Sequence, residues 1–392
     1  MQDWRNAIFN PPPSASFTYK MGNSTVRLQS RLVVALGIIG GIVVLYLMLQ
    51  RSSGGMTVAQ TVWGKSAQTR CNSSYPLSRP LPGRGGVGSR YRIAVITDLD
   101  QASRREASWI SLLRHGWLEW HHRHDGRPPA AELTWDEEDV TVKSSLANGG
   151  RAMELSELVS FGGHLLSVDD RTGVVYQLTN GKAVPWLILA DGDGQVAKGF
   201  KGEWMTVKDN HLYIGGLGKE WTTETGEVLN HNPQFVKRVT CDGRVEHIDW
   251  RPAYQALVAA AGLTPPGYLI HEAAVWSHAR TEWMFLPRRA SNEKYDDMAD
   301  ERRGTNILLR ADETFTNIKK SEVGPIIPTH GFSSFKFIPG TDDTWIIALK
   351  SEEDSAANRT NTYITVFSID GQVALPETPL KGAMKFEGIE FV

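Results

Sequence analysis

The residues best suited to chemistry are five polar sites, each at the start of an apolar segment. We call these sites the heads: Ser156-Glu157, Glu203, Glu272, Ser333 and Glu387. The first four are followed by an apolar run, a polar turn and a second apolar run, whereas the chain ends soon after the fifth. A polar residue can simply cap a strand, but five in the same relative position favour one shared site.

The heads supply carboxylate and hydroxyl oxygens, with one neighbouring imidazole, His271, and no cysteine. All-oxygen ligation suits a hard cation, and many ligands favour Ca²⁺, which accepts about six to eight oxygens, over Mg²⁺. Crowded carboxylates also repel one another unless a cation compensates them. The alternative is a water-filled channel with partly protonated glutamates. The predicted Ca²⁺ ligands are Ser156, Glu157, Glu203, Glu272, Ser333 and Glu387.

A second group of charged residues follows the ends of the apolar runs. Acids and bases mixed around a cation fit a phosphate substrate: cations neutralise phosphate oxygens, and a carboxylate orients or deprotonates the attacking water. For Arg288 and Lys350 the alternative is a surface charge. The catalytic candidates are Asp98, Asp100, Asp169 and Asp170. The substrate-binding candidates are Arg171, Lys219, Glu220, Arg288, Arg289 and Lys350.

Two other classes of propeller compete with a phosphate-hydrolysing enzyme. One is a non-enzymatic binding module that uses calcium only structurally. The other is a glycosidase, which needs a carboxylate pair across a sugar cleft and aromatic platforms rather than the Arg and Lys found here.

The heads also predict the fold. They stand at positions 157, 203, 272, 333 and 387, so they are 46–69 residues apart, which suits propeller blades of about 40–50 residues with insertions. The last unit lacks a second apolar run, but residues 91–96 (YRIAVI) supply one if they pair with the C-terminal strand. We therefore predict an all-β, five-bladed β-propeller closed by its N- and C-terminal strands. One short helix is expected at residues 254–262.

Composition excludes several classes of function. The 392 residues carry 42 basic and 44 acidic side chains, a net charge of −2, so no nucleic-acid partner is expected. The chain has neither the glycine-rich phosphate loop of P-loop enzymes nor the Gly-x-Ser-x-Gly elbow of serine hydrolases.

The N-terminal region predicts a membrane anchor. Residues 1–31 are polar and Pro-bearing, and we expect a cytoplasmic tail without regular structure. Residues 32–49 have no charged side chain; at about 1.5 Å per residue they can span most of a core of about 30 Å. Basic residues before this segment favour a single-pass, type II orientation. Residues 50–90 form a stem, and residues 91–392 form the catalytic propeller. The alternative for residues 32–49 is a buried core segment.

Cysteines and sequons give weaker signals about the compartment. In an oxidising lumen Cys71 can pair with Cys241 or bridge two chains in a homodimer, and a free, buried Cys241 is an equal alternative. Asn72-Ser73-Ser74 and Asn358-Arg359-Thr360 are glycosylation sequons that a lumenal body would expose.

From residue 91 to the C-terminus, the chain also resembles the calcium-activated nucleotidase branch of the apyrase family, and its vertebrate members most closely. The resemblance is carried by IAVITDLD (93–100), MELSEL (153–158), SVDDRTGVVY (167–176), GFKGEWMTV (199–207), GGLGKEWT (215–222), YLIHEAAVW (268–276), FLPRRAS (285–291), HGFSSFKFIP (330–339), ALKSEE (348–353) and KFEGIEFV (385–392).

The resemblance implies a five-bladed propeller with one central Ca²⁺ that hydrolyses nucleoside diphosphates, UDP and GDP in preference, and some triphosphates such as UTP. It implies action in the ER and Golgi lumen in support of glycosylation and proteoglycan synthesis, with secretion after stem cleavage as a further expectation. The family's calcium ligands fall on the same six head residues. One departure is Glu157, where the family usually has Asp, so its role as a direct ligand is open.

Overall fold

The computed structural model describes residues 16–21, 24–29, 71–72, 74–84, 88–121 and 129–392. Two compact units, Met1–Thr69 and Arg70–Val392, are treated separately below. In the first unit, β1 (Ser16–Met21) pairs antiparallel with β2 (Ser24–Gln29). The expectation of no regular structure in residues 1–31 is therefore wrong at this hairpin, whose sequence contains the β-prone residues Phe17, Tyr19 and Val26.

The predicted anchor, residues 32–49, and most of the stem lie outside the described residues. Within the part of the chain that is described, no helix is both long and apolar enough to span a membrane.

The second unit is a five-bladed β-propeller in which each blade is an antiparallel sheet. The first blade contains β8 (Leu155–Phe161), β9 (His164–Asp169), β10 (Val174–Thr179) and β11 (Lys182–Ile188). The second contains β14 (Trp204–Lys208), β15 (His211–Gly215), β18 (Phe235–Val239) and β19 (Val245–Asp249). The third contains β21 (Ala274–Ser277), β22 (Glu282–Phe285), β24 (Ile307–Ala311) and β25 (Ile318–Glu322). The fourth contains β26 (His330–Phe337), β27 (Trp345–Asp354), β28 (Arg359–Ser368) and β29 (Val373–Pro379).

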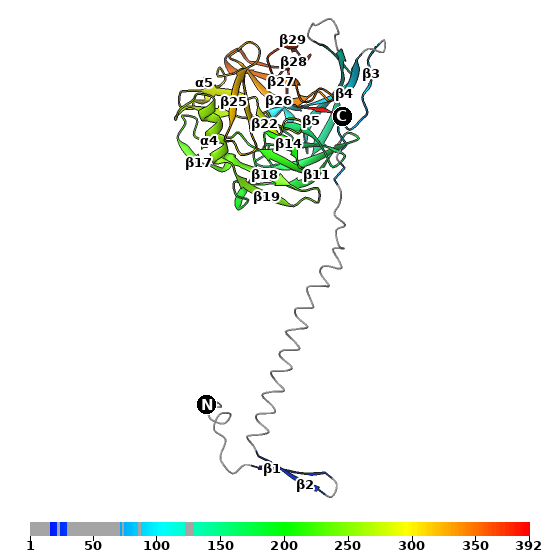
Figure 1. Cartoon of the computed structure of the whole chain (residues 1–392), viewed down its shortest axis with the longest axis vertical. Coiled ribbons are helices and arrows are strands. Elements are labelled where there is room, and N and C mark those ends of the chain that lie inside the picture. Colours follow the sequence, from blue (N-terminus) through cyan, green and yellow to red (C-terminus); the bar gives the residue numbers. More distant parts are fainter. Residues whose placement is uncertain (1–15, 22–23, 30–70, 73, 85–87, 122–128) are drawn as a thin grey trace. The chain divides into compact units, whose positions relative to one another are not determined.

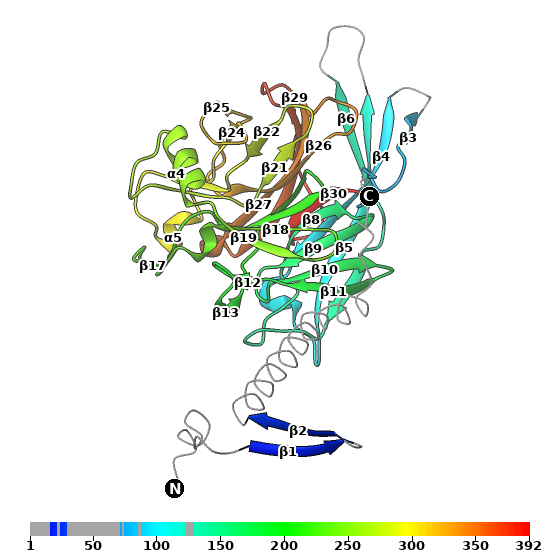
Figure 2. The same ribbon diagram turned by 60° about the horizontal axis from the view of Figure 1, so that its bottom comes forward.

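The fifth blade closes the ring as predicted. Its strands are β30 (Lys385–Phe391), β4 (Ser89–Asp98), β5 (Trp109–His121) and β6 (Ala130–Trp135), with β3 (Leu81–Pro82) and β7 (Val140–Ser144) at its edges. The C-terminal strand β30 pairs with β4 (Figures 1 and 2). In this pair Phe391 faces Ile93 and Lys385 faces Asp98. The innermost strands β8, β14, β21, β26 and β30 contact one another in that cyclic order. Every head therefore lies in the first half of an innermost strand or within two residues before it.

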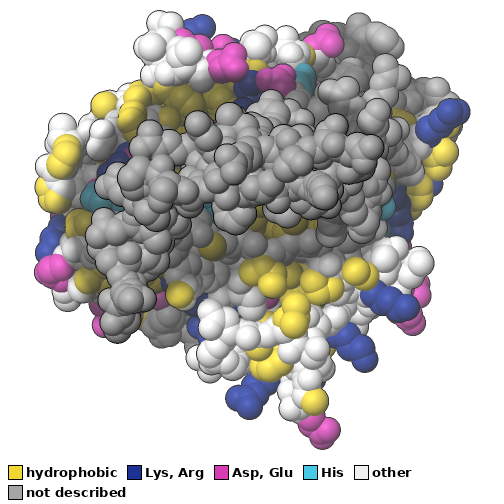
Figure 3. All heavy atoms as spheres, turned by 90° about the horizontal axis from the view of Figure 1, so that it is seen from below, with side chains coloured by type: hydrophobic (Ala, Val, Ile, Leu, Met, Phe, Trp, Pro, Cys, Tyr) yellow, Lys and Arg dark blue, Asp and Glu magenta, His cyan; other side chains and the backbone are white. Residues whose placement is uncertain are grey.

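The core is divided into layers between neighbouring blades. Trp204 of the second blade packs with Trp276 and Trp283 of the third, and Ile347 of the fourth blade packs with Ile389 of the fifth. This layering follows from strands whose two faces are both covered by adjacent blades. The predicted helix is also present, shifted towards the N-terminus, as α4 (Arg251–Ala260). In the part of Figure 3 not covered by grey atoms, basic and acidic side chains are interspersed.

A disulfide joins the segment that enters the propeller to the second blade. Cys71 is bonded to Cys241, across 170 residues of sequence, with the two Cα atoms 5.7 Å apart. Seven residues later, Ser78 Oγ donates to the carbonyl of Val392 at 2.6 Å. Of the three alternatives for the cysteines, the intrachain pair is the one observed.

Replacing both cysteines by serine should lower the free energy of unfolding by about 2–5 kcal/mol, because the cross-link restricts a long loop in the unfolded chain. Urea titration of residues 70–392, with and without the two substitutions, measures the difference. Equal unfolding midpoints and slopes would show that the cross-link contributes nothing to stability.

Candidate active site

Head residues and strand-end residues meet in a cavity of about 220 Å³ at one end of the propeller axis. Nine residues predicted from the sequence line it, from the first, second, third and fifth blades or the connections next to them: Asp98, Asp100, Asp170, Arg171, Glu203, Glu272, Arg288, Arg289 and Glu387. The same wall contains Lys201, Leu217, Ile270, Tyr295, Asp297, Asp300, Glu301, Glu353 and Lys385. The repeat therefore brings most of the predicted acids and bases together.

β-Bulges change the direction of the side chain at three of the heads. In the first, fourth and fifth blades the pairing register shifts by one residue in the first half of the innermost strand. The shifts lie between Leu155 and Glu157, Phe332 and Ser334, and Phe386 and Gly388. The extra residues are Ser156, Ser333 and Glu387. A bulge leaves its extra residue out of the ladder and turns its side chain, so all three are released from the alternation of their strands.

Buried cations stand between the axial carboxylates. Arg288 Nη1 contacts Glu272, and also Glu387 at 3.0 Å. Lys201 Nζ contacts Glu203 at 2.6 Å and contacts Asp170. These pairs leave excess negative charge in a buried site.

The pKa values of the axial glutamates reflect this environment. Burial raises the pKa of Glu203 to about 8 against the opposing charge of Lys201, and Glu272 and Asp170 add to the rise. Burial also raises the pKa of Glu387 well above its ordinary value, although Lys385 opposes the change. Both carboxylates would be stabilised in their charged form by a further cation.

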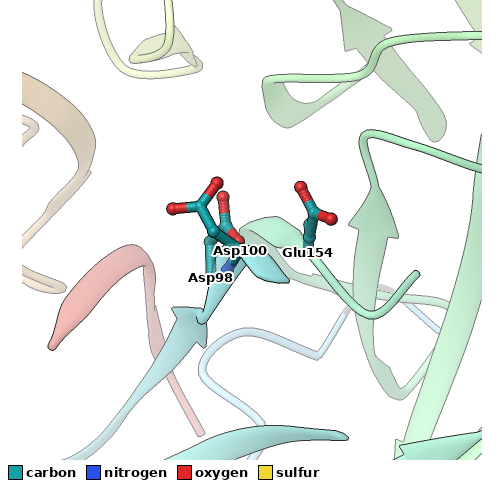
Figure 4. A group of neighbouring side chains, drawn as sticks. All are labelled: Asp98, Asp100 and Glu154. Carbon is teal, nitrogen blue, oxygen red and sulfur yellow. The ribbon is translucent and has the colours of Figure 1, made fainter. Parts of the chain in front are cut away.

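Asp98 and Asp100 form a second acidic group with Glu154. One ligand atom of each lies within 4.8 Å of the other two, and no other such trio of His, Cys, Asp and Glu occurs among the described residues. Figure 4 shows the three carboxylates on the same side of the end of β4. Basic side chains already compensate this group: Lys385 Nζ is 2.8 Å from Asp98, and Arg151 Nη2 is 2.6 Å from Glu154. The axial glutamates are paired with Lys201 and Arg288 in the same way, so this group is a second candidate metal site beside the axial heads.

The carboxylates beside this group have contrasting proton affinities. Burial raises the pKa of Asp98 to about 7, although Lys385 opposes the shift. Lys201 and Arg171 lower the pKa of Asp170 in spite of its burial. Near neutral pH, Asp170 is thus held as a carboxylate, whereas Asp98 can exchange a proton.

Three of the predicted calcium ligands do not line the cavity. Ser156 Oγ is buried and makes no hydrogen bond to the described protein atoms, and Ser333 Oγ makes only a long bond of 3.4 Å to the carbonyl of Phe386. The carboxylate of Glu157 accepts from Ser334 Oγ at 2.7 Å and lies 3.1 Å from Lys336 Nζ. Ser156 thus has an oxygen without a hydrogen bond, while Glu157 has Oε1 hydrogen-bonded and Oε2 in an ion pair with Lys336 but without a hydrogen bond.

Four other predicted residues have protein partners outside this cavity. Asp169 accepts from the backbone N–H groups of Met153 and Arg171, at 2.9 and 3.0 Å, and so fixes a turn. Lys350 pairs with Glu377 at 3.0 Å. Lys219 and Glu220 line a neighbouring cavity of about 530 Å³. Tyr295 lines both cavities, so the two adjoin.

Comparison with known proteins identifies the family. The family model described as Apyrase matches residues 97–392. The chain belongs to the apyrase family. It is 55% identical over 334 residues to "Soluble calcium-activated nucleotidase 1" of Mus musculus, a match that covers 84% of this chain and 81% of that protein. It is 40% identical over 380 residues to the "Apyrase" of Cimex lectularius, covering 96% and 99%. This apyrase is therefore a nucleotide-hydrolysing enzyme. The two competing predictions, a non-enzymatic binding module and a glycosidase, are not supported by the family match.

Sequence reasoning missed two cations of this apyrase that its heads could have revealed. Lys201 and Lys385 each stand two residues before an axial glutamate, in Lys201-Gly202-Glu203 and Lys385-Phe386-Glu387. The repeated Lys-x-Glu spacing is the signal. The acids at 297, 300 and 301 lie in the long connection between β22 and β24 of the third blade, which has no such repeat, and no comparable signal marks them.

Arg289 is the cation of this cavity with the fewest protein partners. It is only 2% exposed, its Nη1 makes no hydrogen bond to the described protein atoms, and the Asp300 carboxylate is 3.8 Å from its Nε. A Cβ atom built on Gly331 would lie 2.6 Å from Arg289 Nη1 and 2.4 Å from Arg288 Cγ. The absence of a side chain at Gly331 thus allows both arginines to approach β26.

Gly331→Ala should displace Arg288 and Arg289 and reduce kcat/KM for nucleotide hydrolysis by about 10–100-fold, because misplacement by about 1 Å can have that effect. Gly116→Ala is the matched control: its added Cβ would be equally crowded, 2.6 Å from the Trp135 ring, but Gly116 is in β5 and does not line the cavity. Steady-state kinetics and melting temperatures separate the effects. Equal losses of activity in the two variants would contradict a specific role for Gly331.

Proposed function

We propose that this apyrase is a calcium-dependent nucleoside diphosphatase that prefers UDP and GDP, and also accepts some triphosphates such as UTP. The observation that carries the proposal is the convergence of Arg171, Arg288 and Arg289 with the axial carboxylates in one cavity. Such a cavity suits a phosphate group held beside a metal ion. The relatives named above include calcium-activated nucleotidases, which supports the choice of metal.

The residues present fit calcium by the chemistry of their donors. Glu203, Glu272 and Glu387 supply carboxylate oxygens, Ser156 has a buried oxygen without a partner, and Ser333 has only a long bond. The raised pKa values of Glu203 and Glu387 further favour an added cation. These five residues would hold the ion, and Glu157 would support them through Ser334. When bound, calcium would supply positive charge that neutralises phosphate oxygens.

The side chains of the cavity would bind the phosphate and activate the attacking water. Arg289 and Arg171 would hold the terminal phosphate, since Arg171 is a third exposed and Arg289 has an unused donor. Asp98 is the better base for the attacking water, because its pKa of about 7 lies near the working pH. Asp170, held as a carboxylate, would orient the water or balance Lys201. Asp169 would act indirectly, by fixing the turn that presents Asp170 and Arg171.

The adjoining cavity has room for the nucleoside. Its volume is about 530 Å³, compared with about 220 Å³ for the charged cavity. Lys219 Nζ lies 4.1 Å from the centre of the Tyr295 ring, at the border of the two. Lys219 and Glu220 would therefore contact the base or ribose rather than the phosphate. Lys350 would act only indirectly, through its ion pair with Glu377.

We place this activity in the lumen of the ER and Golgi, where it would support glycosylation and proteoglycan synthesis by removing nucleoside diphosphates. Residues 32–49 would be the type II anchor, with residues 1–31 cytoplasmic and secretion following cleavage in residues 50–90. The Cys71–Cys241 disulfide supports an oxidising compartment. Because Cys71 is used within the chain, a homodimer would form without a bridge at that cysteine.

Phosphate release by residues 70–392 from UDP, GDP, ADP and UTP tests the substrate assignment. We expect the highest kcat/KM for UDP and GDP, lower values for UTP, and the lowest for ADP. Substrates are compared at one calcium concentration, with heat-inactivated protein as control. A preference for triphosphates over every diphosphate would contradict the diphosphatase assignment.

Glu203→Gln and Glu387→Gln should each abolish most turnover and remove the increase in melting temperature on adding Ca²⁺, because each removes one charged ligand. Glu313→Gln is the control, since Glu313 is exposed and pairs with Lys208. Scanning calorimetry with and without Ca²⁺ accompanies the kinetics. Full calcium stabilisation in both cavity variants would mean that the ion binds elsewhere.

A further inference from the structure

The chain has three sequons for N-linked glycosylation, and they lie on both sides of the predicted anchor. Asn23-Ser24-Thr25 precedes residues 32–49, whereas Asn72-Ser73-Ser74 and Asn358-Arg359-Thr360 follow it. In the proposed type II orientation, only the second and third would enter the lumen. The side chains of Asn72 and Asn358 have different contacts in the folded propeller.

Asn358 stands at an exposed hairpin tip. It follows the short helix Ser355–Ala357 between β27 and β28, and its backbone is left-handed, with φ 48° and ψ 48°. Asn358 and Thr360 are both exposed. Among the described residues, neither the Asn358 side-chain amide nor the Thr360 hydroxyl has a hydrogen-bond partner. A sugar joined to this amide would therefore displace no contact.

Hydrogen bonds from neighbouring residues also fix the hairpin tip. Asp354 accepts from the Ala357 N–H at 3.1 Å and from Arg359 Nη2 at 2.9 Å. Ser355 N donates to Glu301 at 3.0 Å, and Glu301 lines the charged cavity. The tip thus presents Asn358 beside the rim of the cavity, and its fold does not depend on the Asn358 side chain.

Asn72 is also exposed, but its side chain has contacts that the Asn358 side chain lacks. It directly follows the disulfide-bonded Cys71, and its Oδ1 accepts from the Ser74 N–H at 3.0 Å. Its Nδ2, the atom to which a sugar is joined, packs against the turn at Gly163: a Cβ built there would be 2.5 Å away. A glycan on Asn72 would therefore stand directly beside this turn.

We propose that Asn358 is an N-glycosylation site whose oligosaccharide stands at the rim of the active-site cavity. The transfer joins Asn358 Nδ2 to the anomeric carbon of an oligosaccharide carried on a polyisoprenyl diphosphate. The anomeric carbon–phosphate oxygen bond breaks, the amide loses one proton, and the lipid diphosphate leaves. The glycan would keep proteins away from this part of the rim, while a small nucleotide could still enter. This inference rests on the lumenal topology proposed above.

Site-resolved mass spectrometry of the full chain, expressed in animal cells, tests it. Enzymatic release of N-glycans in heavy-oxygen water converts each glycosylated Asn to labelled Asp. We expect the label at Asn358 and not at Asn23. Thr360→Val should remove the label and Thr360→Ser should keep it. Both variants should retain nucleotide hydrolysis, because Thr360 does not line the cavity.

The other outcomes overturn the proposal in distinguishable ways. Label at Asn72 without Asn358 would reject the site but keep the lumenal topology. Label at Asn23 without Asn358 would reject both. No label at any of the three would reject glycosylation of the chain, while phosphate release by the same sample would show independently whether the enzymatic function holds.

Discussion

Mutual repulsion among buried carboxylates is the constraint on which the site depends. Glu203, Glu272 and Glu387 come from three blades to one cavity, and burial of Glu203 and Glu387 leaves little water to screen their charges. Lys201 and Arg288 compensate part of that charge. Burial, with a smaller contribution from neighbouring carboxylates, raises the pKa values of Glu203 and Glu387. A cation on the axis relieves this repulsion, and the same positive charge can attract phosphate.

The closed ring holds these carboxylates together despite their repulsion. Pairing of β30 with β4 joins the two ends of the propeller and fixes Glu387 opposite the other heads. The bulges at Ser156, Ser333 and Glu387 then turn these residues out of their strand ladders. Hydrophobic packing between blades stabilises the ring, so the unfavourable charge at its centre can be concentrated where the chemistry requires it.

The sequence could predict the ring and most of its axis, because the same polar-then-apolar pattern recurs at each innermost strand. It could not predict where Glu157 points: neighbouring residues alternate in a regular strand, and only the bulge at Ser156 shows which of the pair is displaced. Nor could it separate Lys350, which pairs with Glu377, from Arg288, which lies on the axis. Both follow an apolar strand, and their partners are distant in the sequence.

The most direct test of the axial-calcium account is UDP hydrolysis by residues 70–392 that have been freed of metal with a chelator and then supplied with Ca²⁺ or Mg²⁺. The account predicts no turnover without metal, recovery with Ca²⁺, and no recovery with Mg²⁺, because the scattered oxygen ligands of the heads suit the larger and less demanding ion. Equal turnover in the metal-free protein and the Ca²⁺-supplied protein would contradict it.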